Sequence, residues 1–302
     1  MRMMLKKRAS VIITTYNRGD VIGRALDSLQ KQSYRGFELI LVVKPSGDNT
    51  FDVISRYAKS MHVKVFIQDR GHASEAYNIG LNNASGDIVF FLDSDAIAIS
   101  PKWIEKQMAT YESDERIGGL TGDVMGARIS SSGELVPTKM RLCEDPSGWL
   151  PRRTWRRPIS GFEHYRFYLS ISAMPGAVEP PAGESRFLSA GLTGANMSFR
   201  RSAIEGVLLP EFSTKAFWFE QYLAYHAWRR GYKLYKCRDP DMMVYHLENH
   251  PSLTSGHGWK HFAQLRFDRV MMFFNLRIAG FPVRVPAFLA ALGASLFSRV
   301  VR

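Results

Sequence analysis

Two aspartates, Asp93 and Asp95, stand one residue apart directly after the apolar run IVFFL, which we expect to form a buried strand. Open α/β sheets bind ligands beyond the carboxyl ends of their strands, so both carboxylates are expected at that edge. There they can coordinate a hard cation such as Mg²⁺ or Mn²⁺, which in turn neutralises a diphosphate. The same pair could instead cap a following helix, because D-x-D alone is a pattern of low specificity.

The segments that must position these carboxylates alternate between two kinds through the first half of the chain. Some are short, continuously apolar runs, as in strands buried on both faces of a parallel sheet, and others have apolar residues at helical spacing. Strands are predicted at 10–15, 38–43, 63–67 and 87–92, and helices at 20–32, 51–59, 74–84 and 101–111. This order predicts right-handed crossovers and a doubly wound, mostly parallel α/β sheet with helices on both faces.

The second half of the chain is less regular. From about 127 to 189 the periodicity fades and Gly, Pro, Ser and Arg dominate, which is typical of loops that face a substrate. A helical pattern returns at 217–230 and is closed by Gly231, and a short strand is expected near 242–245.

The composition excludes several classes of protein. The 302 residues are 45% hydrophobic, which rules out a disordered or fibrous chain. Two isolated cysteines support neither a disulfide framework nor a zinc site. The basic N-terminus passes directly into a predicted strand and does not resemble a signal peptide, so we expect the catalytic part in the cytoplasm.

A net charge of +12 calls for an anionic partner, such as nucleic acid, a membrane surface or a phosphorylated substrate, or else for a solvated surface. Basic residues gather in PRRTWRRP at 151–158 and recur through the last forty residues, where Phe, Met and Leu separate them. This interleaving favours an anionic membrane surface and argues against nucleic acid, although the 151–158 cluster could also be a solvated loop.

Three motifs together resemble one enzyme family. SVIITTYNR, RGHASEAYNIGLNNASGD and FLDSDA occur in the order and spacing of the family 2 inverting glycosyltransferases with the GT-A fold, and the resemblance covers roughly 9–246. It implies a nucleotide-sugar donor over the strand ends, with the metal on the D-x-D. The donor-binding residues implied are Thr15, Tyr16, Asn17, Lys44, Asp69, Asn78, Asp93, Ser94 and Asp95.

The resemblance also implies a division of the chain. A GT-A domain would cover 1–255, with a nucleotide-sugar-binding half at 9–125 and an acceptor and catalytic half at 126–255. A basic, amphipathic, membrane-associated segment would follow at 256–302.

The base of the donor is expected near Thr15 and Tyr16. Tyr16 offers a stacking face, and Asp69 offers an acceptor for base N–H groups. Family members commonly carry paired acids after the second strand, yet here Lys44 stands in their place and cannot accept a hydrogen bond. Lys44 could meet a phosphate or a base carbonyl, or simply face solvent, while Asp48 could take the role of the acid.

The catalytic base implied by the resemblance is Glu220, placed by its spacing from Leu223 and Gly231. An inverting transfer needs one base for the proton of the acceptor hydroxyl, and aromatic neighbours could raise the pKa of this carboxyl toward working pH. Glu220 could instead only favour the helix N-terminus. The resemblance places Gly194, Asn196 and Trp218 on the acceptor side.

His246 corresponds in order to a histidine that some family members use as a further metal ligand, although a lone histidine is often structural. Cellulose-synthase-like relatives carry a Gln and an Arg-Trp pair on a helix at the membrane. Arg266 and Arg269 lie at a similar place without matching that spacing, and they are weak candidates for a phosphate contact.

Beyond residue 270, uncharged runs are broken by arginines, and the longest, 285–298, is shorter than the roughly 20 residues of a spanning helix. One or two interfacial amphipathic helices are therefore expected. A short spanning helix and a helix packed on the protein's own core are the alternatives.

The sequence thus predicts a metal-dependent inverting glycosyltransferase that uses Mg²⁺ or Mn²⁺ at the cytoplasmic membrane face. The donor is a GDP-sugar or a UDP-sugar, and GDP-mannose is the first candidate because the chain resembles polyprenyl-linked mannosyltransferases. The acceptor would be a lipid-linked glycan, a polyprenyl phosphate or a polysaccharide. A sugar nucleotidyltransferase and a catalytically silent binding module are the rival hypotheses, and TTYNRGD lacks the glycine-rich triphosphate loop that the former needs.

Overall fold

The computed structural model describes residues 8–140, 168–169, 175–176, 184–189, 191–211, 219–248, 259–281, 285–286, 288–289 and 293. The strands are β1 (Ala9–Thr15), β2 (Phe37–Val43), β3 (Val63–Ile67), β4 (Ile88–Leu92), β5 (Ala96–Ala98), β6 (Ile117–Thr121), β7 (Val124–Ile129), β8 (Leu135–Met140), β9 (Tyr168–Leu169), β10 (Pro175–Gly176), β11 (Arg186–Leu188), β12 (Asn196–Arg200), β13 (Lys233–Cys237) and β14 (Val244–Leu247). The helices are α1 (Ile22–Gln30), α2 (Thr50–Tyr57), α3 (Ala73–Asn83), α4 (Trp103–Ser113), α5 (Arg201–Ile204), α6 (Phe219–Arg229), the 3₁₀ turn η1 (Pro240–Met242) and α7 (Trp259–Ile278).

The central sheet has eight strands in the order β11-β13-β6-β12-β4-β1-β2-β3. Strands β1 to β4 are mutually parallel, β6 and β13 are parallel to each other, and β12 lies antiparallel between β4 and β6. The carboxyl ends of β1, β2, β3, β4, β6 and β13 therefore share one edge. The expected α/β sheet is confirmed, and the antiparallel β12 is the feature that the sequence pattern does not predict.

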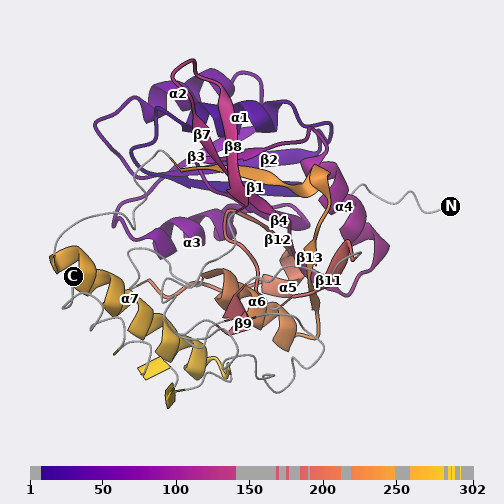
Figure 1. Cartoon of the computed structure of the whole chain (residues 1–302), viewed down its shortest axis with the longest axis vertical. Helices are drawn as coiled ribbons and strands as arrows, with labels where there is room; N and C mark the ends of the chain where they lie inside the picture. The colour runs from indigo at the N-terminus through magenta and orange to yellow at the C-terminus, as the bar shows by residue number, and fades with distance from the viewer. Residues whose placement is uncertain are drawn as a thin grey trace.

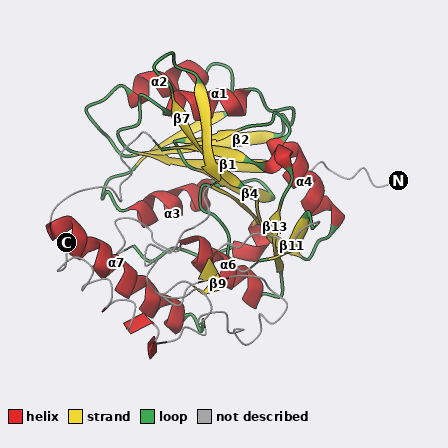
Figure 2. Ribbon diagram, in the orientation of Figure 1, coloured by secondary structure: helices red, strands yellow, loops and turns green. Residues whose placement is uncertain are grey.

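Helices cover both faces of this sheet, as Figure 2 shows. Alternate residues of one strand enter different cores: Val11 and Ile13 pack with α1, α2 and α4, whereas Ile12 packs with α3, α5 and α6. This two-sided burial is the reason why the strands are continuously apolar. Helix α3 lies very close to β1, because a Cβ on Gly80 would come within 2.6 Å of Ile12.

A second, four-stranded sheet with the order β5-β14-β7-β8 lies beside the first. Strand β14 pairs antiparallel with β5, which begins directly after Asp95, and parallel with β7. The sequence pattern predicts a strand near β14 but not this sheet. The pairing of β14, the orange strand in Figure 1, with β5 brings His246 opposite Ala96, directly after the D-x-D turn.

Helix α7 packs on the domain through α6. Met272, Phe273 and Leu276 form a buried cluster with Tyr225 of α6 and with Phe281. Among the residues that the structure describes, no helix combines the length and apolar character needed to cross a bilayer. The long helix that follows the D-x-D turn and His246 thus docks on the protein's own core. Of the stretch 285–298, the structure describes only residues 285–286, 288–289 and 293, so the interfacial helices expected there stay a prediction.

The opposite side of α7 is exposed and apolar. Phe267, Phe274 and Ile278 recur at helical spacing and are 50%, 51% and 83% exposed. The face that packs on α6 and the exposed stripe therefore lie on opposite sides of one helix.

Candidate functional site

The D-x-D carboxylates and His246 come together through the pairing of two short strands. Asp93 to Asp95 form a turn closed by a hydrogen bond from the Ala96 amide to the Asp93 carbonyl, 2.9 Å long. In the β5–β14 ladder His246 lies opposite Ala96, and the Leu247 amide donates to the Asp95 carbonyl at 3.0 Å. The backbone thus fixes the imidazole beside both carboxylates.

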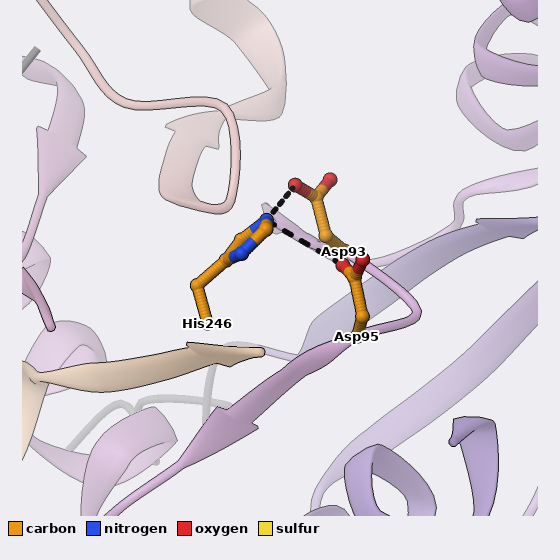
Figure 3. A group of neighbouring side chains, drawn as sticks. All are labelled: Asp93, Asp95 and His246. Atoms are coloured by element: carbon orange, nitrogen blue, oxygen red, sulfur yellow. Dashed lines mark ion pairs between the residues drawn. The ribbon is translucent and has the colours of Figure 1, made fainter. Parts of the chain in front are cut away.

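The three side chains converge on one point (Figure 3). The His246 Nε2 atom lies 3.5 Å from Asp93 Oδ2 and 3.5 Å from Asp95 Oδ1, and all three candidate ligand atoms lie within 4.8 Å of one another. Adjacent ligands of an octahedral cation with bonds of about 2.1 Å lie about 3 Å apart, so the group needs little movement to surround one. Two carboxylates and an imidazole fit a divalent cation.

The charges around Asp95 also favour a bound cation. Burial raises the pKa of the Asp95 carboxyl, as does the charge of Asp93, while His246 and the Arg18 guanidinium act to lower it. The net upward direction shows that the negative charge at Asp95 is incompletely compensated by its protein neighbours. A divalent cation would supply the missing positive charge.

Glu220 lies in the first turn of α6 and belongs to the same site. Burial, joined by the negative charge of Asp93, raises the pKa of its carboxyl from the ordinary 4.5 to about 7. A carboxylate with a pKa near neutrality is suited to take up a proton in a reaction at physiological pH. The effect of the Asp93 charge shows that Glu220 lies near the cation group, by which we mean Asp93, Asp95 and His246. The role of catalytic base stays a prediction.

Aromatic rings hold the start of α6 in place. Phe219 stacks on Tyr77 of α3 with 4.2 Å between the ring centroids, and it also meets Phe91 of β4 edge to face. Gly194 leaves room for this arrangement, because a Cβ there would lie 3.0 Å from the Phe219 ring and 3.8 Å from a Glu220 carboxylate oxygen. Gly194 thus lies beside the candidate base, and its predicted place on the acceptor side stays a prediction.

Tyr77 was not singled out by the sequence pattern. Its pKa is raised well above the ordinary 10, first by burial and then by the charges of Asp93, Glu220 and Asp95. The Tyr77 hydroxyl therefore lies close enough to the three carboxylates of the site to sense their charge.

The predicted base-binding residues lie at the ends of β1, β2 and β3. Tyr16 is 41% exposed, and the Lys44 ammonium lies 4.5 Å from the centre of its ring, in a cation–π contact. Lys44 also fills the space beside Gly71, whose φ of +81° suits glycine. Asp69 is exposed just beyond β3. Thr15 is buried, and its hydroxyl oxygen has no hydrogen-bond partner among the described residues.

Asp48 makes hydrogen bonds within the protein in place of the base or ribose contact that we considered for it. Its carboxylate accepts hydrogen bonds from the Gly19 amide at 2.8 Å, from Ser46 and from Thr50. These donors hold its pKa at about 2 in spite of partial burial. The residue ties the β2–α2 loop to the β1–α1 loop, where exposed Asn17 has a φ of 54°.

Two asparagines predicted to contact substrate are instead used to hold the backbone. Asn78 is 4% exposed and exchanges hydrogen bonds with the Leu209 carbonyl and amide. Asn196 is fully buried, donates to the Asp123 and Met242 carbonyls and accepts from the Trp103 indole. Both side chains join segments that surround the site and do not present their amides to it.

The remaining candidates are placed as follows. Ser94 is buried within the D-x-D turn. Arg266 and Arg269 lie on α7 with partly buried side chains, on the helix that packs against α6. Trp218 lies outside the described residues.

One further charged residue belongs to the site and was missed. The Arg18 guanidinium lies 3.8 Å from Asp95 Oδ2, and its side chain is only 14% exposed. The available signal was its place in TTYNRGD, in the loop directly after β1.

Comparison of the sequence with known proteins gives a consistent result. The family model described as "Glycosyl transferase family 2" matches residues 10–168, more than half of the chain. Glycosyltransferase GlyA of Streptococcus pneumoniae is 30% identical over 125 residues, which are 38% of this chain and 17% of that protein. Poly(ribitol-phosphate) beta-N-acetylglucosaminyltransferase TarP of Staphylococcus aureus is 37% identical over 93 residues, 30% of this chain and 28% of TarP. The chain therefore matches less than a third of the length of either relative.

Solved structures share the fold over most of the chain. S. aureus TarS 1–349 in complex with UDP-GlcNAc superposes with a TM-score of 0.56 at 17% identity, covering 86% of this chain and 65% of the other. Mannosyltransferase PcManGT from Pyrobaculum calidifontis, in complex with GDP-Man and Mn²⁺, gives a TM-score of 0.53 at 16% identity and covers 98% and 88%. With the family model matching from the first strand through the D-x-D turn and beyond, the chain belongs to glycosyl transferase family 2.

Proposed function

We propose that this protein is an inverting, metal-dependent glycosyltransferase, which transfers a sugar from a nucleoside-diphosphate sugar to an acceptor hydroxyl. The observation that carries the proposal is the meeting of the Asp93, Asp95 and His246 group with Glu220, whose pKa is about 7. Such a transfer needs side chains that can coordinate a cation and a side chain that can act as a base, and both are present in this site.

The candidate cation ligands and Glu220 have separate roles in the proposed reaction. A divalent cation on Asp93, Asp95 and His246 would neutralise the charge of the departing diphosphate. Glu220 accepts the proton of the acceptor hydroxyl while that oxygen bonds to the anomeric carbon and the bond to the diphosphate oxygen breaks on the opposite side. The aromatic packing of Phe219 holds Glu220 in place for this proton transfer.

We propose Mn²⁺ as the working cation, with Mg²⁺ as a weaker substitute. Two carboxylates suit either ion, but an imidazole nitrogen is a better ligand for the transition metal. The Mn²⁺ bound by PcManGT supports this choice.

For the donor, GDP-mannose remains our first candidate, and UDP-GlcNAc is its direct rival. PcManGT binds GDP-Man, and TarS binds UDP-GlcNAc, so the fold accommodates both classes of donor. The exposed Tyr16 ring and the Lys44 ammonium above it provide a stacking surface and a donor for base carbonyls, which both uracil and guanine carry.

For the acceptor, we propose a lipid-linked glycan or polyprenyl phosphate at the cytoplasmic face of the membrane. The support is the exposed apolar stripe of α7 together with the basic tail. An exposed apolar stripe with basic residues near it can enter the headgroup region, where each basic residue adds about 1 kcal/mol on anionic lipid.

Purified protein and a panel of donors test the proposal. Nucleotide release and thermal shift would be measured with UDP-GlcNAc, GDP-mannose and related donors, in Mn²⁺ and in EDTA. We expect one donor to stabilise the protein in a Mn²⁺-dependent way, since a ligand selective for the folded state raises the melting temperature by mass action. Asp93→Asn should abolish this response, and Asp52→Asn, at an exposed position on α2, should retain it.

The rival hypotheses make different predictions in the same experiment. A sugar nucleotidyltransferase would consume a nucleoside triphosphate and a sugar phosphate, and neither the family match nor the TTYNRGD loop supports it. A silent binding module would bind the donor but show no turnover that depends on Glu220. Nucleotide release that is unaffected by Glu220→Gln would overturn the assignment of the base.

A further inference from the structure

The loop between β1 and α1 carries an arginine inward, toward the cation group. The same loop contains two exposed residues, Asn17 and Asp20, yet the Arg18 side chain is only 14% exposed. A guanidinium is normally kept in water unless a partner compensates it. Its ion-pair partner here is Asp95, at 3.8 Å.

Several contacts fix the path of this loop. The Arg18 amide donates to Thr50 Oγ1 at 3.2 Å, and the Gly19 amide donates to Asp48 Oδ2 at 2.8 Å. Gly19 lies so close to Asn49 that any side chain would overlap it. Together with the left-handed backbone at Asn17, these contacts hold the loop against the start of α2 and direct Arg18 toward Asp95.

The two oxygens of Asp95 face different partners. Oδ1 lies 3.5 Å from His246 Nε2 and forms part of the cation group, whereas Oδ2 lies 3.8 Å from the Arg18 guanidinium. At 3.8 Å the guanidinium attracts Oδ2 as an ion-pair partner and favours the rotation of the carboxylate that keeps Oδ2 toward it. In that rotation Oδ1 is the oxygen that faces His246 and the cation.

We infer that Arg18 is a positioning residue for cation binding, which holds Asp95 through Oδ2 so that Oδ1 faces the cation together with His246. This inference rests on the proposed cation site and adds a residue to it. Partners of this kind, one shell outside the metal ligands, typically alter metal affinity by about 10- to 100-fold when they are removed.

The direction in which cation affinity changes when Arg18 is removed distinguishes a positioning role from simple charge repulsion. If Arg18 acted on the cation only through its positive charge, its removal would tighten cation binding. If it orients Asp95, its removal weakens binding, because the ligand oxygen is no longer held in place. The Asp95 carboxylate lies between the Arg18 guanidinium and the position of the cation, and its negative charge offsets the repulsion between these two positive charges. We therefore expect the removal of Arg18 to weaken cation binding.

Mn²⁺ binding to the full chain, measured by electron paramagnetic resonance without any nucleotide, tests the inference independently of turnover. We expect the dissociation constant to rise about tenfold or more in Arg18→Gln. Arg18→Lys should recover part of the affinity because an ammonium can still pair with Oδ2. The control is Arg35→Gln, at an exposed arginine between α1 and β2, and it should bind Mn²⁺ as the wild type does.

The outcomes are distinguishable. Unchanged or tighter Mn²⁺ binding by a folded Arg18→Gln protein overturns the role of Arg18 and leaves the cation site standing. If Arg18→Gln does not fold, Arg18→Lys decides: we expect it to bind Mn²⁺ more weakly than the wild type, and an affinity equal to or tighter than that of the wild type overturns the role of the Arg18 guanidinium in positioning Asp95. A wild-type protein that binds no Mn²⁺ overturns the cation site and the role of Arg18 together.

Discussion

Replacing Glu220 by glutamine removes the proposed base and keeps the shape of the side chain. Loss of a general base lowers the transfer rate by about 10²- to 10⁴-fold, and donor binding should survive because the cation group is intact. In the wild type, the rate should fall on the acid side as Glu220 becomes protonated. A bound cation offsets the charge of Asp93, so the midpoint should lie between the ordinary 4.5 and about 7.

The same substitution should stabilise the protein at high pH. The folded-state pKa of Glu220 is raised, so its contribution to stability is fully present below about 4.5 and is lost as the pH rises through about 7. A rise from 4.5 to about 7 corresponds to a penalty of up to about 3 kcal/mol for the charged form. In EDTA, Glu220→Gln should therefore melt higher than the wild type at pH 8, and this advantage should vanish near pH 4.5.

The two readouts use separate assays and one matched control. Stopped-time nucleotide release at saturating donor gives the pH profile, and calorimetry in EDTA gives the melting temperatures. Glu115→Gln, at an exposed glutamate, should change neither. An acid limb that persists in Glu220→Gln would assign the titration to another group, and a melting-temperature difference independent of pH would show that burial does not raise the pKa of Glu220.

Three further substitutions test other parts of the site. Asp95→Asn should abolish Mn²⁺-dependent nucleotide binding in a thermal-shift assay while the circular dichroism spectrum is unchanged, and retained binding in EDTA would contradict the cation site. Gly194→Ala places a Cβ 3.0 Å from the Phe219 ring, so we expect the turnover number to fall several-fold while Mn²⁺ affinity measured by electron paramagnetic resonance stays the same. The double substitution of Phe267 and Phe274 by glutamate should weaken sedimentation with anionic liposomes by at least about tenfold without lowering soluble donor turnover, and equal sedimentation would refute the proposed membrane face.

The parts of the fold that follow from local pattern were predictable. Buried parallel strands are continuously apolar, so β1 to β4 stand out in the sequence, and Gly231, at a φ of +85°, ends α6 where expected. The antiparallel β12 and the second sheet were not predictable, since a short strand such as β5 carries no periodicity that reveals its partner.

The site was predictable where residue type alone defines the chemistry. Two carboxylates and a histidine indicate a cation site from the sequence, but it is the β5–β14 pairing that brings them close together. Asn78 and Asn196 illustrate the limit, because an amide that holds a buried backbone is indistinguishable in sequence from one that binds substrate. Arg18 shows the converse, since only the course of its loop reveals that a charged side chain turns inward.

The pairing of β5 with β14 also sets an order in which the protein can become competent during synthesis. Asp93 and Asp95 leave the ribosome long before His246, and among the described strands β5 has β14 as its only partner. A nascent chain that ends before β14 therefore has an unpaired β5 and only two of the three candidate ligands. If the proposed cation site is correct, its full affinity can arise only after residue 247 has joined the ladder, so a chain released before β14 should bind the cation more weakly.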